Sequence, residues 1–105
     1  MALEVETKQL DSTSLISVTG EVDLYTSPEL RSAIMDAVPA AAATVAVDLS
    51  GVRYMDSSGV ATLVEGLRRC RDLDKVFKLV APSTAVMKVL ELAKLDSVFE
   101  VCSSP

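Results

Sequence analysis

The chain has 105 residues, a formal net charge of −5, 50% hydrophobic residues and only 4% aromatic residues. This length allows one hydrophobic core, so we expect a single domain over 1–105 with its ordered core over about 3–101. The acidic balance disfavours direct binding to nucleic acid or anionic membranes, and the scarcity of aromatic rings disfavours sites that stack bases or sugars.

The first residues predict a β-hairpin. Apolar and polar residues alternate over 3–8, which is the period of a half-buried strand, and 15–19 predicts a second strand. The turn-forming cluster at 11–13 separates the two segments, so they are expected to pair in antiparallel fashion. Gly20 then indicates a bend or a close approach of the backbone.

A helix is expected to follow this hairpin, beginning at Thr26 or Ser27. Ser27 is a favourable N-cap residue, and Pro28 is suited to the first helical position. Pro39 and the alanines after it are expected to end the helix. The apolar stretch over 37–47 is interrupted by this proline and is short of the roughly 20 residues that span a bilayer. We therefore expect no membrane insertion and a cytoplasmic protein.

The rest of the chain predicts alternating strands and helices: strands over 44–49, 76–80 and 98–101, and helices over 57–71 and 85–94. The run 44–49 is almost continuously apolar, as in a central strand buried on both faces. The expected fold class is α/β, with a mixed central β-sheet that starts with the antiparallel hairpin and has helices packed on it.

The segment Asp56-Ser57-Ser58-Gly59 lies between a predicted strand and the helix that follows it. Backbone N–H groups at a helix N-terminus lack intrahelical acceptors, so an anion bound or attached there is stabilised. Phosphorylation of a serine would add about −1.5 to −2 charge and would act on association more than on folding. The alternative interpretation is that Asp56 and Ser57 only cap the helix.

Enzymatic function is not expected. The chain contains no histidine, which excludes Ser-His-Asp and Cys-His arrangements, and it has no glycine-rich nucleotide loop. Cys70 and Cys102 cannot complete a tetrahedral zinc site without carboxylates. Asp23 and Asp56 could be imagined as paired catalytic acids, but turn or capping roles fit them better. No metal or cofactor of its own is expected.

Two segments resemble a known family. The residues at 47–60, VDLSGVRYMDSSGV, resemble the phosphorylation loop of the STAS-domain anti-sigma factor antagonists. The earlier block at 19–26, TGEVDLYT, resembles the first conserved block of the same family. The separation of the two blocks and the order of predicted elements fit this family across essentially the whole chain.

The resemblance implies a phosphorylation-controlled binding module, a monomer or weak dimer. The unphosphorylated form would bind an anti-sigma factor that is also a serine kinase, and so release the sigma factor. That kinase, with its own ATP and Mg²⁺, would phosphorylate the first hydroxyl after the loop aspartate, Ser57, and a serine phosphatase would restore it. The residues implied to bind the partner are Asp23, Thr26, Met55, Asp56, Ser58, Gly59 and Val60.

Two other functions stay open from the sequence. Some STAS domains lack phosphorylation, so the chain could be a subunit of a lipid or solute transport complex that uses the same surface. A small-ligand or nucleotide-binding sensor is the third interpretation.

Overall fold

The structure, a computed structural model, describes residues 3–105, and over that range it has five strands and three helices. The elements are β1 (Glu4–Leu10), β2 (Thr13–Val22), α1 (Ser27–Ala40), β3 (Thr44–Met55), α2 (Ser57–Asp72), β4 (Val76–Val80), α3 (Thr84–Leu92) and β5 (Glu100–Cys102). The sheet order is β1-β2-β3-β4-β5, with β1 antiparallel to β2 and every other pair parallel. This confirms the mixed α/β sheet and its N-terminal hairpin.

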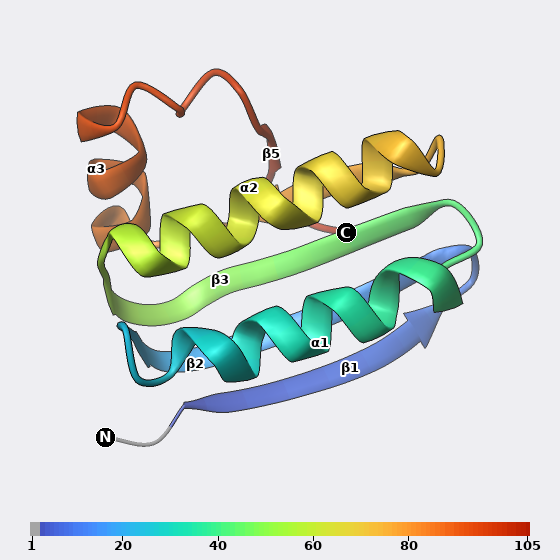
Figure 1. Ribbon diagram of the computed structural model, residues 1–105, viewed down its shortest axis with the longest axis horizontal. Helices are drawn as coiled ribbons and strands as arrows, with labels where there is room; N and C mark the ends of the chain where they lie inside the picture. Colours follow the sequence, from blue (N-terminus) through green and yellow to red (C-terminus); the bar gives the residue numbers. More distant parts are fainter. Residues whose placement is uncertain (1–2) are drawn as a thin grey trace.

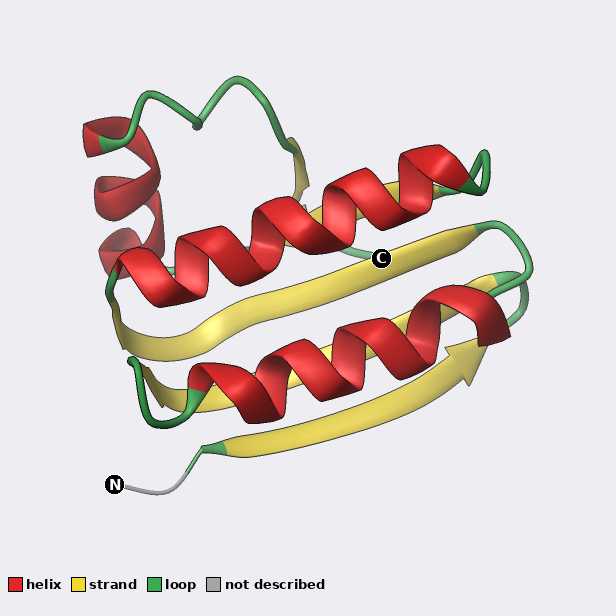
Figure 2. Ribbon diagram, in the orientation of Figure 1, coloured by secondary structure: helices red, strands yellow, loops and turns green. Residues whose placement is uncertain are grey.

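Helices α1 and α2 lie side by side across one face of the sheet, while α3 lies beyond the N-terminal end of α2 (Figures 1 and 2). Along β3, Val45, Val47 and Leu49 point into the core between sheet and helices, and all three are fully buried. Ala46 is buried as well, so this segment is covered on both faces, as its continuous apolar run predicts. In the described part of the chain, no helix is long and apolar enough to cross a membrane.

The two central strands are longer than the sequence predicts. β3 was expected to end at residue 49, but it continues to Met55, and β2 continues to Val22. The extensions pair with each other in parallel, with register shifts at Ser17/Thr19 and Gly20/Glu21. Each strand therefore supplies hydrogen-bond partners for the backbone N–H and C=O groups of the other. A Cβ at Gly51 would lie 2.9 Å from Thr19 Oγ1, which explains the glycine at this close approach.

Helix α1 ends at Ala40, within the segment of Pro39 and the following alanines that was predicted to end it, so Pro39 lies inside its last turn. The carbonyl groups of a last turn have no intrahelical donor. Here the Lys75 ammonium donates to the carbonyls of Val38 at 2.7 Å and Pro39 at 3.4 Å, and the N–H of Ala41 donates to Ala37 at 2.9 Å. These donors stabilise the end of the helix.

The C-terminal elements are displaced slightly from the predicted ranges. α3 ends at Leu92, two residues earlier than the predicted end at 94, because Lys94 has a left-handed backbone with φ 60°. The N–H of Leu95 donates to the carbonyl of Leu90 at 2.9 Å, which closes this helix end. The last strand covers Glu100–Cys102 in place of 98–101 and pairs in parallel with β4.

Candidate functional site at the carboxyl ends of β2 and β3

The two loops singled out from the sequence lie at one edge of the sheet. Val22 and Met55, the last residues of β2 and β3, are paired in the parallel ladder. The N–H of Asp56 donates to the carbonyl of Val22 at 3.1 Å, so the two chain segments stay together as they leave the sheet. The loops that lead into α1 and α2 are therefore neighbours, as Figure 1 shows at the left of the molecule.

Asp56 caps the N-terminus of α2. Its carboxylate accepts hydrogen bonds from the backbone N–H of Ser58 at 2.9 Å and from the hydroxyl of Ser58 at 2.5 Å. Its carbonyl accepts from the N–H groups of Gly59 at 3.1 Å and Val60 at 3.3 Å. These contacts fix the first turn of the helix, and they use the hydroxyl of Ser58 to do so.

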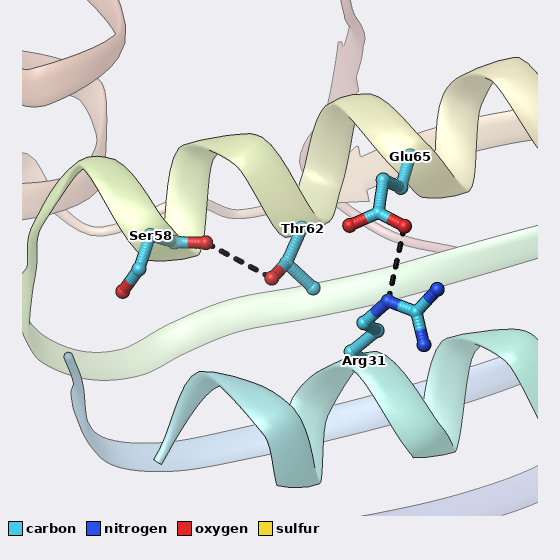
Figure 3. Close-up of polar contacts among 4 residues, drawn as sticks. All are labelled: Arg31, Ser58, Thr62 and Glu65. Carbon is cyan, nitrogen blue, oxygen red and sulfur yellow. Dashed lines mark hydrogen bonds and ion pairs between the residues drawn. The ribbon is translucent and has the colours of Figure 1, made fainter. Parts of the chain in front are cut away.

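Ser57 differs from Ser58 in its surroundings. It is the first residue of α2, it is exposed, and none of the side-chain hydrogen bonds among residues 3–105 involves it. Ser58 is half-buried, and its carbonyl accepts a hydrogen bond from the hydroxyl of buried Thr62 at 2.9 Å (Figure 3). Of the two hydroxyls, only that of Ser57 is available to a reagent without breaking an internal contact.

An ion pair joins the two helices further along. Arg31 of α1 donates through Nε to Glu65 of α2 at 3.0 Å (Figure 3). Both side chains are about half exposed, so the pair adds little stability. The pair engages the carboxylate of Glu65, about two turns along α2 from Ser57.

The loop before α1 is organised by Asp23. One carboxylate oxygen, Oδ1, accepts from the N–H groups of Tyr25 at 2.9 Å and Thr26 at 3.0 Å. The hydroxyl of Thr26 donates to the carbonyl of Glu21 at 2.8 Å and accepts from the N–H of Asp23 at 2.9 Å. The hydrogen bond from the Thr26 backbone is the largest cause that lowers the pKa of the Asp23 carboxyl, and partial desolvation opposes it.

The start of α1 differs from the sequence prediction. Ser27 was predicted as the N-cap, but Thr26 occupies that position and makes no capping bond with its side chain. Ser27 is the buried first residue of the helix, and its N–H donates to the carbonyl of Asp23 at 2.8 Å. The turn at Asp23 accepts hydrogen bonds from the backbone N–H groups that precede the helix, so no serine cap is needed. Pro28 lies one position further into the helix than expected.

Three large side chains near these loops point into solvent. Leu24 is 70% exposed, Tyr25 is 89% exposed and Tyr54, beside Glu21 in the ladder, is 49% exposed. The contact residues predicted from the sequence include none of these three. The sequence carries no signal for the exposure of Leu24 and Tyr25, because their turn depends on acceptors from Asp23 and Glu21.

The residues implied to bind the partner fall into two layers. Asp23, Thr26, Asp56 and Ser58 are partly exposed at the surface, whereas Met55, Gly59 and Val60 are buried beneath it. A Cβ at Gly59 would lie 2.6 Å from Met55 Cγ and 2.9 Å from Val22 Cγ1, so the glycine lets α2 approach the strand ends. The buried layer sets the shape of the site, and one of its residues, Val60, also lines a groove beside Ser57.

A groove of about 420 Å³ runs from Ser57 between α2 and α3. It is lined by Val60, Ala61, Val64, Glu65 and Arg68 from α2, and by Val89, Ala93 and Leu95 from α3 and the turn after it. Its walls are mostly apolar, and its charged residues, Glu65 and Arg68, lie about two and three turns along α2 from Ser57. The site thus combines a free hydroxyl, two acidic loops and an adjacent apolar surface.

The chemistry available to this edge of the sheet is limited. Within residues 3–105 no group of three or more His, Cys, Asp or Glu side chains could hold a metal ion. Cys70 is buried in α2 and Cys102 lies on β5, away from the loops. The hydroxyl of Ser57 is exposed at this edge, at a helix end where an attached anion is stabilised.

Comparison with known proteins gives the family. Residues 5–100 match the family model described as "Mlab, STAS domain". An anti-sigma-B factor antagonist of Staphylococcus aureus is 30% identical over 101 residues, covering 96% of this chain and 94% of that protein. The chain therefore belongs to the STAS domain family.

Two solved structures extend the comparison. The crystal structure of an anti-sigma factor antagonist from Mycobacterium paratuberculosis has a TM-score of 0.87 and 27% identity, covering 98% of this chain and 87% of that one. The Bacillus cell fate determinant SpoIIAA in its phosphorylated form has a TM-score of 0.71 and 25% identity, covering 95% and 90%. The whole α/β architecture described above is shared with these proteins.

Proposed function

We propose that this protein is an anti-sigma factor antagonist that binds its partner through the loops at the carboxyl ends of β2 and β3, and that phosphorylation of Ser57 ends this binding. The relatives named as anti-sigma-B factor antagonists support the class of function. One observation carries the switch: Ser57 offers an exposed, unengaged hydroxyl at the start of α2, whereas the hydroxyl of Ser58 is bound to Asp56.

The proposed partner is an anti-sigma factor with serine kinase activity. Ser57 Oγ attacks the γ-phosphorus of the ATP held by that kinase with Mg²⁺. A new O–P bond forms as the bond to ADP breaks, and the hydroxyl proton passes to a base of the kinase. A serine phosphatase reverses the change by hydrolysing that O–P bond. ATP and Mg²⁺ belong to the kinase, so this chain contributes the acceptor hydroxyl and needs no cofactor.

The fold is expected to tolerate the phosphate. Ser57 is exposed, so the group needs no space in the core. An anion in the first turn of a helix gains about 0.3–1 kcal/mol from the backbone N–H groups and the helix dipole. The capping bonds of Asp56 use Ser58 and later residues, and they persist when Ser57 is modified.

The partner, in contrast, would be affected strongly. The phosphate adds about −1.5 to −2 charge beside Asp56 and close to Asp23, on a chain whose net charge is already −5. A partner packed over Leu24, Tyr25 and Ser57 would meet both the bulk and the added charge. The change therefore acts on association. We place this activity in the cytoplasm, where sigma factors and the ATP of the kinase are found.

The decisive experiment is phosphorylation by the cognate anti-sigma kinase with Mg²⁺ and ATP, followed by intact mass measurement and peptide mapping. We expect one phosphate, on Ser57, in the natural protein and none in Ser57→Ala. Ser58→Ala is the matched control: it removes a hydroxyl of the same kind one residue away and is expected to accept phosphate. Stable phosphate on Ser58, or tight binding to the kinase with no modification, would contradict the assignment of Ser57 as the phosphorylated residue.

A second measurement separates the switch from a structural role. Ser57→Asp is expected to weaken the complex with the kinase while leaving the melting temperature nearly unchanged. A large drop in melting temperature would mean that Ser57 is chiefly structural. Capture of a transport ATPase by the unmodified protein, with no phosphate transfer, would support a transport-complex subunit in its place.

A further inference from the structure

A second surface lies away from the site, along the outer edge of β1. Among the described residues, β1 pairs with a strand on one side only, and its pairing with β2 has no register shift over Glu4–Leu10. The strand contains no proline. Its outer edge therefore offers an uninterrupted row of backbone N–H and C=O groups, which is a template for a further strand.

The side chains of β1 divide between the two faces of the sheet. Val5 and Thr7 line a groove against α1, so Glu6 and Lys8 point to the opposite face, which α1 does not cover. Glu6 and Lys8 are exposed, and within residues 3–105 neither has a hydrogen-bond or ion-pair partner. They lie on either side of Thr7, the middle residue of the seven-residue strand.

We propose that two copies of this chain associate by antiparallel pairing of their β1 strands about a two-fold axis at Thr7. An axis perpendicular to the sheet keeps the helices of both copies on the same face. Each residue can then oppose only residues that point to that same face. The two-fold axis must then pass through a residue of the strand. An axis at Glu6, Thr7 or Lys8 lets the two strands pair over most of their length.

Charge selects among these registers. Centring on Glu6 or on Lys8 places that residue opposite its own copy, and like charges directly opposite are destabilising. Centring on Thr7 places Glu6 of each copy opposite Lys8 of the other, twice in the interface. This register is also the one in which all seven residues of Glu4–Leu10 find a partner.

The groove between β1 and α1 explains why such an association would be weak. It has a volume of about 390 Å³, and its apolar floor, which includes Val5 and Ala33, would face its own copy across the axis. Its walls also carry Glu29 and Asp36, and each chain has a net charge of −5, so repulsion opposes the contact. The proposal does not rest on the function of Ser57.

The test is the mass of the full chain in solution over a wide range of concentrations, measured by analytical ultracentrifugation. We expect the mass of the natural protein to rise from one chain towards two. Glu6→Lys and Lys8→Glu should each weaken the dimer about tenfold or more, because each turns two attractive pairs into repulsive ones. The double variant Glu6→Lys, Lys8→Glu should restore it, and a mixture of the two single variants should form a heterodimer.

Glu4→Lys is the matched control for Glu6→Lys. It makes the same charge change on the same face of the same strand, but in the proposed register residue 4 opposes Leu10, so the dimer should persist. All of these side chains are exposed, and thermal melting will establish that each variant is folded. A natural protein that stays monomeric at every concentration, dimers insensitive to the single changes, or a double variant that fails to recover would overturn the proposal.

Discussion

The loops after β2 and β3 share a pattern of backbone hydrogen bonds to an aspartate, but they expose different side chains. In each, an aspartate just past the strand end accepts at least one backbone N–H and so organises the start of a helix. The Asp56 loop presents a small reactive hydroxyl, that of Ser57. The Asp23 loop presents two large side chains, Leu24 and Tyr25. The contrast suggests a division of roles, in which one loop is modified and the other supplies contact area.

The largest expected effect falls on the contact loop. Replacing both Leu24 and Tyr25 by alanine should weaken binding of the unphosphorylated protein to the proposed partner kinase by about 2 kcal/mol or more, roughly 30-fold in Kd. Stability should stay within about 0.5 kcal/mol, because both side chains are exposed. Calorimetric titration measures the affinity. Leu73→Ala, which removes an exposed leucine near the far end of α2, is the control. Unchanged affinity in the double variant would remove the contact role.

A smaller effect is expected on stability in the Asp56 loop. Asp56→Ala removes the cap of α2 and should cost about 1 kcal/mol, because the N–H of Ser58 loses its acceptor. Ser57→Ala should change stability by less than about 0.5 kcal/mol, because no internal hydrogen bond is lost. Denaturant unfolding of the three proteins checks both values. Equal losses of unfolding free energy in the two variants would contradict the distinction between Asp56 as the helix cap and Ser57 as the phosphate acceptor.

The smallest effect is a dependence on pH at Asp23. Its folded pKa lies below the ordinary value of 3.8, so the carboxylate adds stability that is present above the unfolded pKa and is lost as pH falls through the folded pKa. The advantage of the natural protein over Asp23→Asn should therefore be full near neutral pH and decline below about pH 4. Thermal melting across a pH series measures it. A constant difference down to acid pH would be inconsistent with the hydrogen bonds from Tyr25 and Thr26.

Much of the fold could be predicted from the sequence, because it depends on local pattern. The strand Val76–Val80 agrees with its prediction, and the helix Ser57–Asp72 agrees to within a residue at its end, since both have clear apolar periodicity. The end of β3 could not be predicted. Its last residues, from Ser50 onward, are mixed in polarity, and their strand conformation comes from pairing with β2. The hydrogen bond from Lys75 to the last turn of α1 could not be predicted either, because the two segments are distant in sequence.

The site could be predicted in part. An acid, two serines and a glycine at a helix start indicated an anion-tolerant loop, and the family resemblance selected Ser57. The structure adds an independent reason for that choice, because it engages Ser58 and leaves Ser57 exposed. The exposure of Leu24 and Tyr25 could not be read from the sequence. It depends on a turn whose acceptors come from Asp23 and Glu21.

Both loops follow the two longest strands, which lie in the interior of the sheet. β2 lies between β1 and β3, and β3 lies between β2 and β4. Amides such as those of Ile16 and Val47, fully buried in these strands, should be among the slowest in the molecule to exchange with deuterium, since they open only with global unfolding. The two loops therefore project from the most persistent part of the fold, and their relative position should survive local fluctuations elsewhere.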